Sequence, residues 1–200
     1  MAVLEKRLLG DGFVRIAGID EAGRGSLAGP VVAAACILPQ NTYFEHLNDS
    51  KQLTPAIREI LYEKITSHPG ICFAIGMSDA ETIDRVNILQ ATFLAMKAAI
   101  EKLDPSPDFL LVDGSQVPAY DKIPMRAVIK GDSTSISIAA ASIIAKVTRD
   151  WMMIKEYDLK WPQYGFKKHK GYPTPQHFEA IDKSGPCPLH RISFHPFSAL

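Results

Sequence analysis

The stretch that most constrains the fold of this chain is residues 16–38, IAGIDEAGRGSLAGPVVAAACIL. Apolar residues lead into the adjacent carboxylates Asp20 and Glu21, a glycine-interrupted turn follows, and eight apolar residues run from Val31 to Leu38. Two short apolar runs joined by such a turn predict an antiparallel hairpin. Adjacent carboxylates at the end of a buried strand are costly unless a positive partner meets them. The stretch therefore predicts half of a metal site beside a backbone-lined groove.

Further apolar runs predict a mixed sheet with helices on its faces. The predicted strands are residues 12–20, 31–38, 71–77, 109–112 and 125–129. One helix is predicted after Thr54-Pro55, a second from the capping-box pair Ser78 and Glu81 to Leu103, and a third from about Ser135 to Tyr157. Strands joined through helices favour an α/β fold of about five strands.

The last part of the chain is expected to be an appendage to this layer. From Trp161 onward the sequence is rich in Pro, Gly and His, and a short helix is predicted after Thr174-Pro175. We therefore expect residues 1–160 to form the main domain and residues 161–200 to complete it as part of a single structural unit.

Composition limits the class of protein. The chain has 200 residues, 46% of them apolar, which is enough for one good core. Its amino-terminal segment is too charged for a signal peptide, and no run approaches the ~18 apolar residues of a membrane helix. A cytoplasmic protein without a membrane partner is expected. The widely spaced Cys36, Cys72 and Cys187 predict buried, reduced thiols instead of a disulfide framework or a zinc site.

The net charge of zero hides an uneven distribution. Between Lys122 and Lys170 there are ten basic residues and four acidic ones, a local excess of six positive charges. Scattered, solvated lysines are the plain explanation. The run Lys167-Lys168-His169-Lys170 instead favours a surface that faces phosphate groups.

Carboxylates follow three of the predicted strands, as Asp20-Glu21, Asp113 and Asp132. Taken alone, Asp113-Gly114 can be a turn and Asp132 can cap a helix. Neighbouring strands of one sheet would instead bring all of them together, and such a group stays ionised only around cations. Oxygen ligands select Mg²⁺ or Mn²⁺, and a pair of these ions is typical of phosphodiester hydrolysis.

Five blocks, in order and over nearly the whole chain, resemble the pattern of the ribonuclease HII family. They are GIDEAGRGSLAGPVVAAACIL, DSKQLT, VDGSQ, KGDSTSISIAAASIIAKVTRD and YGFKKHKGYPT. The related ribonuclease HIII family is similar in fold but carries an additional amino-terminal domain and lacks the GRG form of the loop. The GRG sequence at residues 23–25, with no room for that domain, favours type HII.

The resemblance implies a ribonuclease H-like fold and an endonuclease with two related activities. It would hydrolyse the RNA strand of RNA/DNA hybrids and cut 5′ to single ribonucleotides in duplex DNA, leaving 5′-phosphate and 3′-hydroxyl ends. Its partners would be those nucleic acids, and it would act as a monomer. Asp20, Glu21, Asp113 and Asp132 match the four catalytic carboxylates, which hold two divalent cations, with Asp20 bridging them.

The resemblance also implies how the substrate is recognised. Gly23, Arg24 and Gly25 match the loop that reads 2′-hydroxyls at the junction of ribonucleotide and deoxyribonucleotide. Tyr172 matches a tyrosine that stacks on the following deoxyribose; without the family, a half-buried tail residue is an equal alternative.

Several other residues are weaker candidates. Phosphate contacts are expected from Ser50-Lys51, Lys146, Arg149, His169 and Lys170, with a solvated helix position as the alternative for Lys146. Asp150 is expected to partner Arg149 or to cap a helix. Asn87 and Gln90 can either face the groove or form ordinary polar surface.

Three other functions compete with this interpretation. A dinucleotide-binding module needs GxGxxG leading into a helix, whereas here the glycine spacing differs and an apolar strand follows. A non-catalytic RNA/DNA hybrid-binding protein of the same fold is disfavoured because all four carboxylates are present. Another metal nuclease or transposase-like enzyme is disfavoured by the GRG and HKGY blocks.

Overall fold

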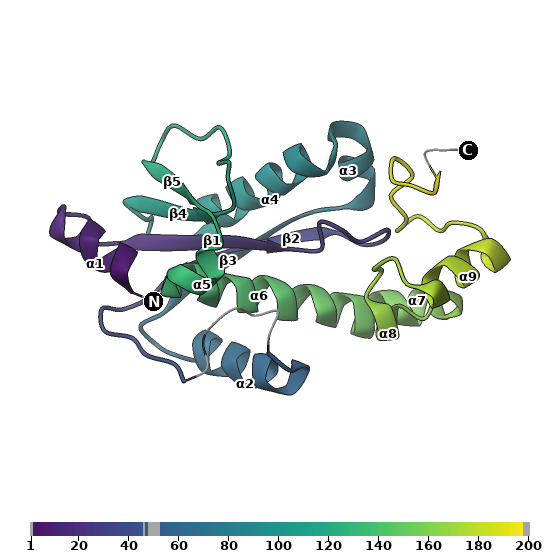
Figure 1. Cartoon of the computed structure of the whole chain (residues 1–200), viewed down its shortest axis with the longest axis horizontal. Helices are drawn as coiled ribbons and strands as arrows, with labels where there is room; N and C mark the ends of the chain where they lie inside the picture. The colour runs from purple at the N-terminus through teal and green to yellow at the C-terminus, as the bar shows by residue number, and fades with distance from the viewer. Residues whose placement is uncertain (1, 46, 48–52, 198–200) are drawn as a thin grey trace.

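The computed structural model describes residues 2–45, 47 and 53–197 and contains a five-stranded mixed sheet covered by helices on both faces (Figure 1). The strands are β1 (Ile16–Ala22), β2 (Val31–Ile37), β3 (Cys72–Ser78), β4 (Phe109–Asp113) and β5 (Met125–Val128). Their order is β3-β2-β1-β4-β5, with β2 antiparallel to β1 and β3, and β4 parallel to β1 and β5. The predicted α/β class and the antiparallel first hairpin are confirmed.

Helices α3 and α4 lie on one side of the sheet, and α2 and α6 lie on the other (Figure 1). The helices are α1 (Val3–Gly10), α2 (Pro55–Thr66), α3 (Ala80–Val86), α4 (Ile88–Lys102), α5 (Gly131–Thr134), α6 (Ile136–Met152), α7 (Asp158–Lys160), α8 (Phe166–His169) and α9 (Pro175–Ser184). A π-helical turn (Met153–Tyr157) and a 3₁₀ turn (Pro162–Tyr164) follow α6 and α7, respectively. The sequence did not predict α1, which packs Leu8 against Ile16 and Leu111.

Two helix starts follow the predicted capping chemistry. Thr54 accepts a hydrogen bond from the Ile57 N–H with Pro55 in the first turn of α2. Thr174 does the same for His177 at the start of α9. Both helices therefore begin where a threonine oxygen satisfies an amide that would otherwise lack a partner.

The predicted capping box at Ser78 is wrong. Ser78 belongs to β3, and Asp79 caps α3 instead. The predicted long helix is also interrupted, because Asn87 takes a left-handed φ of 69° between α3 and α4. The Asn87 side chain accepts from the Gln90 N–H at 3.0 Å, so this pair forms the cap of α4. The Asn87 side chain is thus used as a helix cap, whereas Gln90 contributes only its backbone N–H and its side chain is exposed.

β1 lies unusually close to α6, and Gly18 makes this possible. A Cβ atom at Gly18 would lie 2.1 Å from the backbone nitrogen of Ile138, so no larger residue fits. The alanines 139–141 on the facing helix are fully buried, as their small size predicts. Asp20 is two residues after Gly18 and so lies on the same face of β1. The close packing of β1 on α6 therefore places Asp20 against the helix.

The segment from residue 161 to 197 packs over the loop that follows β1. Its side chains form a cluster with loop residues and the π-helical turn; the buried members are Leu27, Ala28, Met153, Tyr164, Phe166, Ile181 and Phe197. The backbone joins the same elements, since the Leu27 N–H donates to the Gly171 carbonyl at 2.8 Å. The carboxyl-terminal segment therefore helps to shape the glycine loop.

All three cysteines are free thiols; the predicted burial is confirmed for Cys36 and is wrong for Cys72 and Cys187, which are half-buried. In the described part of the chain, none of the helices combines the length and the apolar character that crossing a bilayer requires.

Candidate active site

The carboxyl ends of β1, β4 and β5 meet at one edge of the sheet, because the three strands are parallel. Ile19 pairs with Val112, so Asp20 and Asp113 occupy the next positions along their strands. A cavity of about 250 Å³ opens at this edge. Its lining residues are Asp20, Glu21, Ala22, Gly23, Arg24, Gly25, Asp113, Ser142, Lys146 and Tyr172. The structure thus brings three predicted carboxylates together with the glycine loop and Tyr172.

The surroundings of Asp20 perturb its ionisation. It is only 4% exposed, and its Oδ1 accepts from the Glu21 N–H at 2.7 Å. Burial raises the pKa of Asp20 well above its ordinary value, and the charges of Glu21 and Asp113 raise it further. A hydrogen bond from the Ser142 side chain acts in the opposite direction. This electrostatic environment suits a bound cation, which would stabilise the ionised carboxylates.

Asp132 lies close to this cavity but is not among its lining residues. The Asp113 Oδ1 accepts from the Gly131 N–H at 2.7 Å, which ties the start of α5 to the end of β4. Asp132 follows within the same short helix and is 4% exposed. Lys130, at a left-handed φ of 54°, turns the chain into that helix. Asp132 is therefore the residue next to Gly131, whose N–H is bonded to Asp113.

The donor set fits a hard divalent cation. Within residues 2–45, 47 and 53–197, no three Asp, Glu, His or Cys side chains lie close enough together to hold a metal ion by themselves. Asp20, Glu21 and Asp113 instead line an open cavity with carboxylate oxygens. Mg²⁺ is commonly held by one or two carboxylates together with water and substrate phosphate, so an open oxygen-lined cavity suits it better than a cage would.

The glycine loop runs along one side of the cavity. Gly23 has a φ of 92°, and a Cβ atom there would lie 2.0 Å from the Arg149 side chain. Arg24 is exposed, and its Nη1 donates to the Glu21 Oε1 at 3.1 Å. Gly25 is exposed as well. Because Gly25 has no side chain, a sugar can approach the loop backbone closely at this position.

Arg191, which the sequence did not predict as a functional residue, holds this loop by hydrogen bonds to its carbonyls. It is fully buried, and its Nε donates to the Gly29 carbonyl at 3.0 Å. Its Nη1 donates to the Arg24 carbonyl at 2.9 Å, and its Nη2 donates to the Gly23 carbonyl at 2.7 Å. No carboxylate in the described residues forms an ion pair with it. A single arginine near the end of a chain carries no pattern from which this role can be predicted.

Arg149 is a second buried guanidinium with only carbonyl partners. Its nitrogens donate to the carbonyls of Pro30 at 2.9 Å, Lys170 at 3.0 Å and Ala28 at 3.0 Å. Burial lowers its pKa from the ordinary value. Its side chain is fully buried, so it has no access to a phosphate in this structure. Arg149 instead joins the loop after β1 to the turn before Tyr172, whose ring centroid lies 5.4 Å from the guanidinium.

Lys146 extends from α6 between the cavity and a neighbouring groove. Its Nζ lies 2.8 Å from the Asp150 Oδ1 and 5.4 Å from the Tyr172 ring centroid. The expectation that Asp150 would partner Arg149 is therefore wrong, because Asp150 pairs with Lys146 one helical turn earlier. The alternative for Lys146 was a solvated position on the helix surface. Lys146 is half-buried, so it does not occupy such a position.

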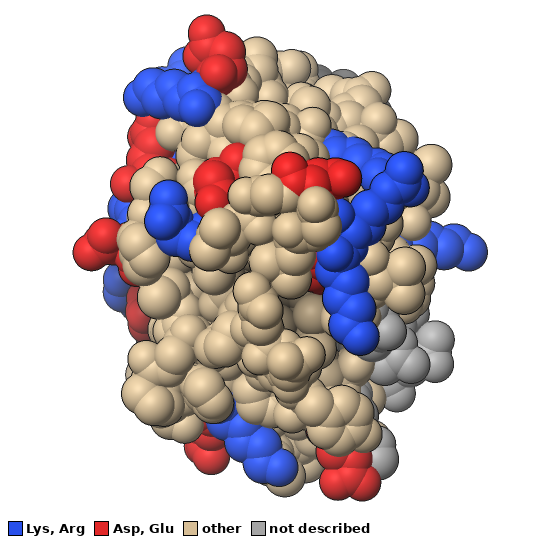
Figure 2. Space-filling view, turned by 90° about the vertical axis from the view of Figure 1, so that its left-hand side faces the viewer, with Lys and Arg blue, Asp and Glu red and all other residues tan. Residues whose placement is uncertain are grey.

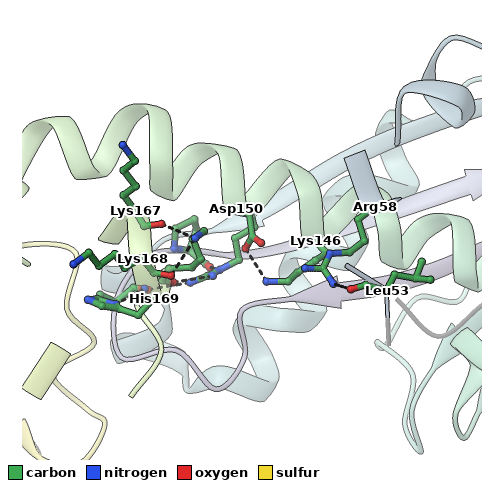
Figure 3. Close-up of polar contacts among 12 residues, drawn as sticks. Leu53, Arg58, Lys146, Asp150, Lys167, Lys168 and His169 are labelled. Atoms are coloured by element: carbon green, nitrogen blue, oxygen red, sulfur yellow. Dashed lines mark hydrogen bonds and ion pairs between the residues drawn. The ribbon is translucent and has the colours of Figure 1, made fainter. Parts of the chain in front are cut away.

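The neighbouring groove of about 320 Å³ runs between α2, α6 and residues 168–172. Its lining residues are Pro55, Arg58, Glu59, Lys146, Val147, Asp150, Trp151, Ile154, Lys168, His169, Lys170 and Tyr172. Figure 3 shows Lys146 and Asp150 on one helix, with Arg58 nearby and Lys167, Lys168 and His169 on the segment opposite. Basic side chains from three elements therefore surround this groove.

The remaining predicted phosphate contacts differ in their setting. The Lys170 Nζ donates to the carbonyls of Lys167 at 2.6 Å and Lys168 at 3.2 Å. His169 is 8% exposed, and both of its ring nitrogens are bonded to backbone atoms. Ser50-Lys51 lies outside the described residues. A phosphate role for these residues stays a prediction.

Among the residues that the structure describes, the end of the molecule near α1 lacks the clustered carboxylates of the cavity around Asp20 and Asp113. Figure 2 views the α1 end of the sheet, where acidic and basic side chains are interspersed and much of the surface carries neither. A cavity of about 400 Å³ lies beside α1 and residues 38–42. Glu5 is the one carboxylate among its lining residues in the described part of the chain, and its Oε1 accepts from the Ser137 hydroxyl at 2.8 Å. This cavity therefore lacks the clustered carboxylates of the other.

Comparison with known proteins gives a consistent result. A protein-family model described as Ribonuclease HII matches residues 17–197. The Ribonuclease HII of Chlamydia caviae is 52% identical over 194 residues, which is 97% of this chain and 90% of that protein. The crystal structure of ribonuclease H2 from Pyrococcus horikoshii OT3 has a TM-score of 0.75 at 27% identity and covers 93% of this chain and 96% of its own. Bst-RNase HIII, solved in complex with Mn²⁺, has the same fold, with a TM-score of 0.64 at 19% identity over 92% of this chain and 68% of that one.

Proposed function

The chain belongs to the ribonuclease HII family, and on that basis we propose that it is a metal-dependent endonuclease acting on RNA within RNA/DNA duplexes. It hydrolyses the RNA strand of hybrids and cuts 5′ to a single ribonucleotide embedded in DNA, leaving 5′-phosphate and 3′-hydroxyl ends. The observation that carries this proposal is the shared cavity of Asp20, Glu21, Asp113, the 23–25 loop and Tyr172. All of these groups come from one chain, so a monomer is sufficient.

We assign the metal-binding role to Asp20, Glu21, Asp113 and Asp132. Two divalent cations, Mg²⁺ or Mn²⁺, would activate the attacking water and stabilise the leaving oxygen when they are bound there. The raised pKa of Asp20 supports this role, because crowded carboxylates favour a site that a cation neutralises. The Mn²⁺ complex of the similarly folded Bst-RNase HIII is consistent with hard cations of this type.

We propose that the 23–25 loop selects the sugar. The 2′-hydroxyl distinguishes RNA from DNA, and exposed backbone at Gly25 can approach it closely. Arg191 occupies the carbonyls of Gly23 and Arg24, so the shape of the loop is set before a substrate arrives. Arg24 also donates to Glu21, which links sugar selection to a proposed metal ligand.

We propose that the basic groove beside the cavity carries the phosphodiester backbone. Lys146 and Tyr172 line both spaces, so a strand that passes through the cavity can continue into the groove. Lys168, Lys170 and Arg58 surround its path. In this arrangement residues 161–200 complete a substrate groove that the layer formed by residues 1–160 begins. These basic side chains would act on phosphate mainly by charge, which predicts weaker binding at higher salt.

The proposed activity can be tested with a labelled DNA duplex that contains one ribonucleotide. Cleavage is expected in Mg²⁺ or Mn²⁺ but not in excess chelator, with the cut immediately 5′ to the ribonucleotide. An all-DNA duplex of the same sequence is the control. Equal cleavage of both duplexes would contradict the proposed selectivity, and tight binding without cleavage under all metal conditions would support the hybrid-binding alternative.

Tyr172→Ala is expected to reduce cleavage of the single-ribonucleotide duplex by about 10-fold, since loss of one aromatic stacking contact costs ~1–3 kcal/mol. Cleavage of an all-RNA/DNA hybrid is expected to change little. Steady-state rates on both substrates test this, with Tyr43→Ala as a control because Tyr43 is 81% exposed. Equal losses on the two substrates would show that Tyr172 does not stack selectively.

A further inference from the structure

Three buried histidines from separate segments lie beneath the turn that carries Tyr172. His169, His177 and His190 are 8%, 0% and 2% exposed, respectively. The rings of His169 and His177 stack with their centroids 4.3 Å apart, and those of His177 and His190 are 5.3 Å apart. Three buried ionisable rings are costly unless their polar atoms are hydrogen-bonded, and here every ring nitrogen has a partner.

The hydrogen bonds assign one tautomer to His190 and one to His177. The Cys187 N–H can only donate, and it lies 2.9 Å from the His190 Nδ1, so the His190 proton resides on Nε2. The Cys187 carbonyl is farther from Nδ1, at 3.3 Å, and already accepts from the His190 backbone. The His190 Nε2 lies 3.1 Å from the His177 Nε2 and donates to it. The His177 proton is then on Nδ1, which donates to the Tyr172 carbonyl at 3.0 Å.

His169 completes the attachment of the same turn. Its Nδ1 accepts from the Gly171 N–H at 3.2 Å, and its carbonyl accepts from the Tyr172 N–H at 2.9 Å. Its Nε2 consequently carries the proton and donates to the Tyr164 carbonyl at 2.8 Å. Both backbone polar groups of Tyr172 are therefore bonded to histidines, one through the ring of His177 and the other through the main chain of His169.

We propose that His177, supported by His190, is a positioning residue that orients Tyr172 and thereby favours duplexes with a single ribonucleotide. The proposal rests on the function proposed above, in which Tyr172 stacks on the sugar after the ribonucleotide. His177 touches no substrate in this arrangement and acts only through the Tyr172 backbone. Burial lowers the pKa of His177 and His190 to about 4, which keeps both rings in the neutral forms that the relay requires near neutral pH.

Two substitutions at His177 separate its two hydrogen bonds. The amide of His177→Gln reaches the position of Nε2, so it can accept from His190 but leaves the Tyr172 carbonyl without a donor. The shorter amide of His177→Asn reaches the position of Nδ1 and can still donate to that carbonyl. A purely structural histidine would be disturbed at least as much by the asparagine, which removes more of the buried side chain.

Steady-state kcat and KM in Mg²⁺ on the single-ribonucleotide duplex and on an all-RNA/DNA hybrid provide the test. His177→Gln is expected to lose about 10-fold in kcat/KM on the first substrate and less than about 2-fold on the second, as one lost hydrogen bond to a buried carbonyl would produce. His177→Asn is expected to stay within about 3-fold of the original protein on both. Equal losses on the two substrates, or equal behaviour of the two variants, would overturn the proposal.

Measuring His177→Gln in a protein that already carries Tyr172→Ala separates the positioning role of His177 from the stacking role of Tyr172. In a Tyr172→Ala protein, adding His177→Gln is expected to change the substrate ratio by less than about 2-fold, because contacting residues are not additive. If Tyr172→Ala alone does not discriminate between the substrates, the proposed stacking role fails. If it discriminates but His177→Gln does not, only the positioning role fails.

Two further variants complete the design. His195→Gln is the matched control, because His195 lies exposed in the same terminal segment. If His177→Gln does not fold by circular dichroism, His190→Asn carries the same test. It keeps an acceptor for the Cys187 N–H and removes the donor to His177, together with the ring contacts of His190. A selective loss on the single-ribonucleotide duplex is expected, and an equal loss on the hybrid would overturn the proposal.

Discussion

Asp113→Asn is expected to lower kcat on the single-ribonucleotide duplex by at least about 1,000-fold, because a bound metal contributes several kcal/mol of charge stabilisation in the transition state. The substitution removes one negative charge from the cavity shared with Asp20 and Glu21. The asparagine oxygen can still accept the Gly131 N–H, so the link between β4 and α5 is retained. Folding and substrate binding are therefore expected to survive.

Single-turnover cleavage, duplex binding and thermal unfolding should be measured on the same preparation. Asp182→Asn is the matched control, since Asp182 lies exposed on α9, away from the cavity. Near-normal turnover in Asp113→Asn would contradict the assignment of Asp113 as a metal ligand. A loss of binding equal to the loss of turnover would mean that the carboxylate serves the fold or the substrate instead.

Arg191→Lys is expected to lower the free energy of unfolding by about 3–5 kcal/mol, although the charge is kept. The planar guanidinium serves the carbonyls of Gly23, Arg24 and Gly29 together, whereas an ammonium on a single carbon chain cannot span all three. Each buried carbonyl left without a donor costs ~1–3 kcal/mol. For a chain of this length the midpoint of thermal unfolding is expected to fall by about 10 °C.

The same variant should also lose its preference for RNA over DNA, because the 23–25 loop would no longer be held in one shape. Thermal unfolding and cleavage of ribonucleotide-containing and all-DNA duplexes measure the two effects. Arg126→Lys is the control, since Arg126 is exposed on β5. An Arg191→Lys protein as stable and as selective as the control would show that the carbonyl contacts are dispensable.

The sequence predicted the strands of the sheet and the starts of α2 and α9, but it missed α1 and misplaced the start of α3. The apolar runs identified all five strands, and the predicted mixed sheet with an antiparallel first hairpin is confirmed. Helix α1 was missed because eight residues span only about two helical turns, too few to establish a helical period. The error at Ser78 arose because Asp79 offers an equally good cap one residue later.

The candidate site was also predicted only in part. Charged residues at strand ends predicted the cavity of Asp20, Glu21 and Asp113, because strand topology alone determines where those side chains meet. Arg191 and His177 escaped prediction because their partners are backbone carbonyls, which for Arg191 lie more than 160 residues earlier in the chain and for His177 belong to Tyr172, five residues earlier. A carbonyl is present at every residue, so no residue type marks the position that a buried donor will contact.

The bonds between the end of the chain and the glycine loop impose an order on biosynthesis. The Arg191 N–H donates to the Leu27 carbonyl at 2.8 Å, and the Gly29 N–H donates to the Leu189 carbonyl at 2.8 Å. A polypeptide emerges from the ribosome with its amino end first, so these bonds form only after nearly all of the described chain has been made. The strands that bear Asp20 and Asp113 are available much earlier. A nascent chain therefore acquires its acidic cavity before it acquires the loop shape that we propose to choose the sugar.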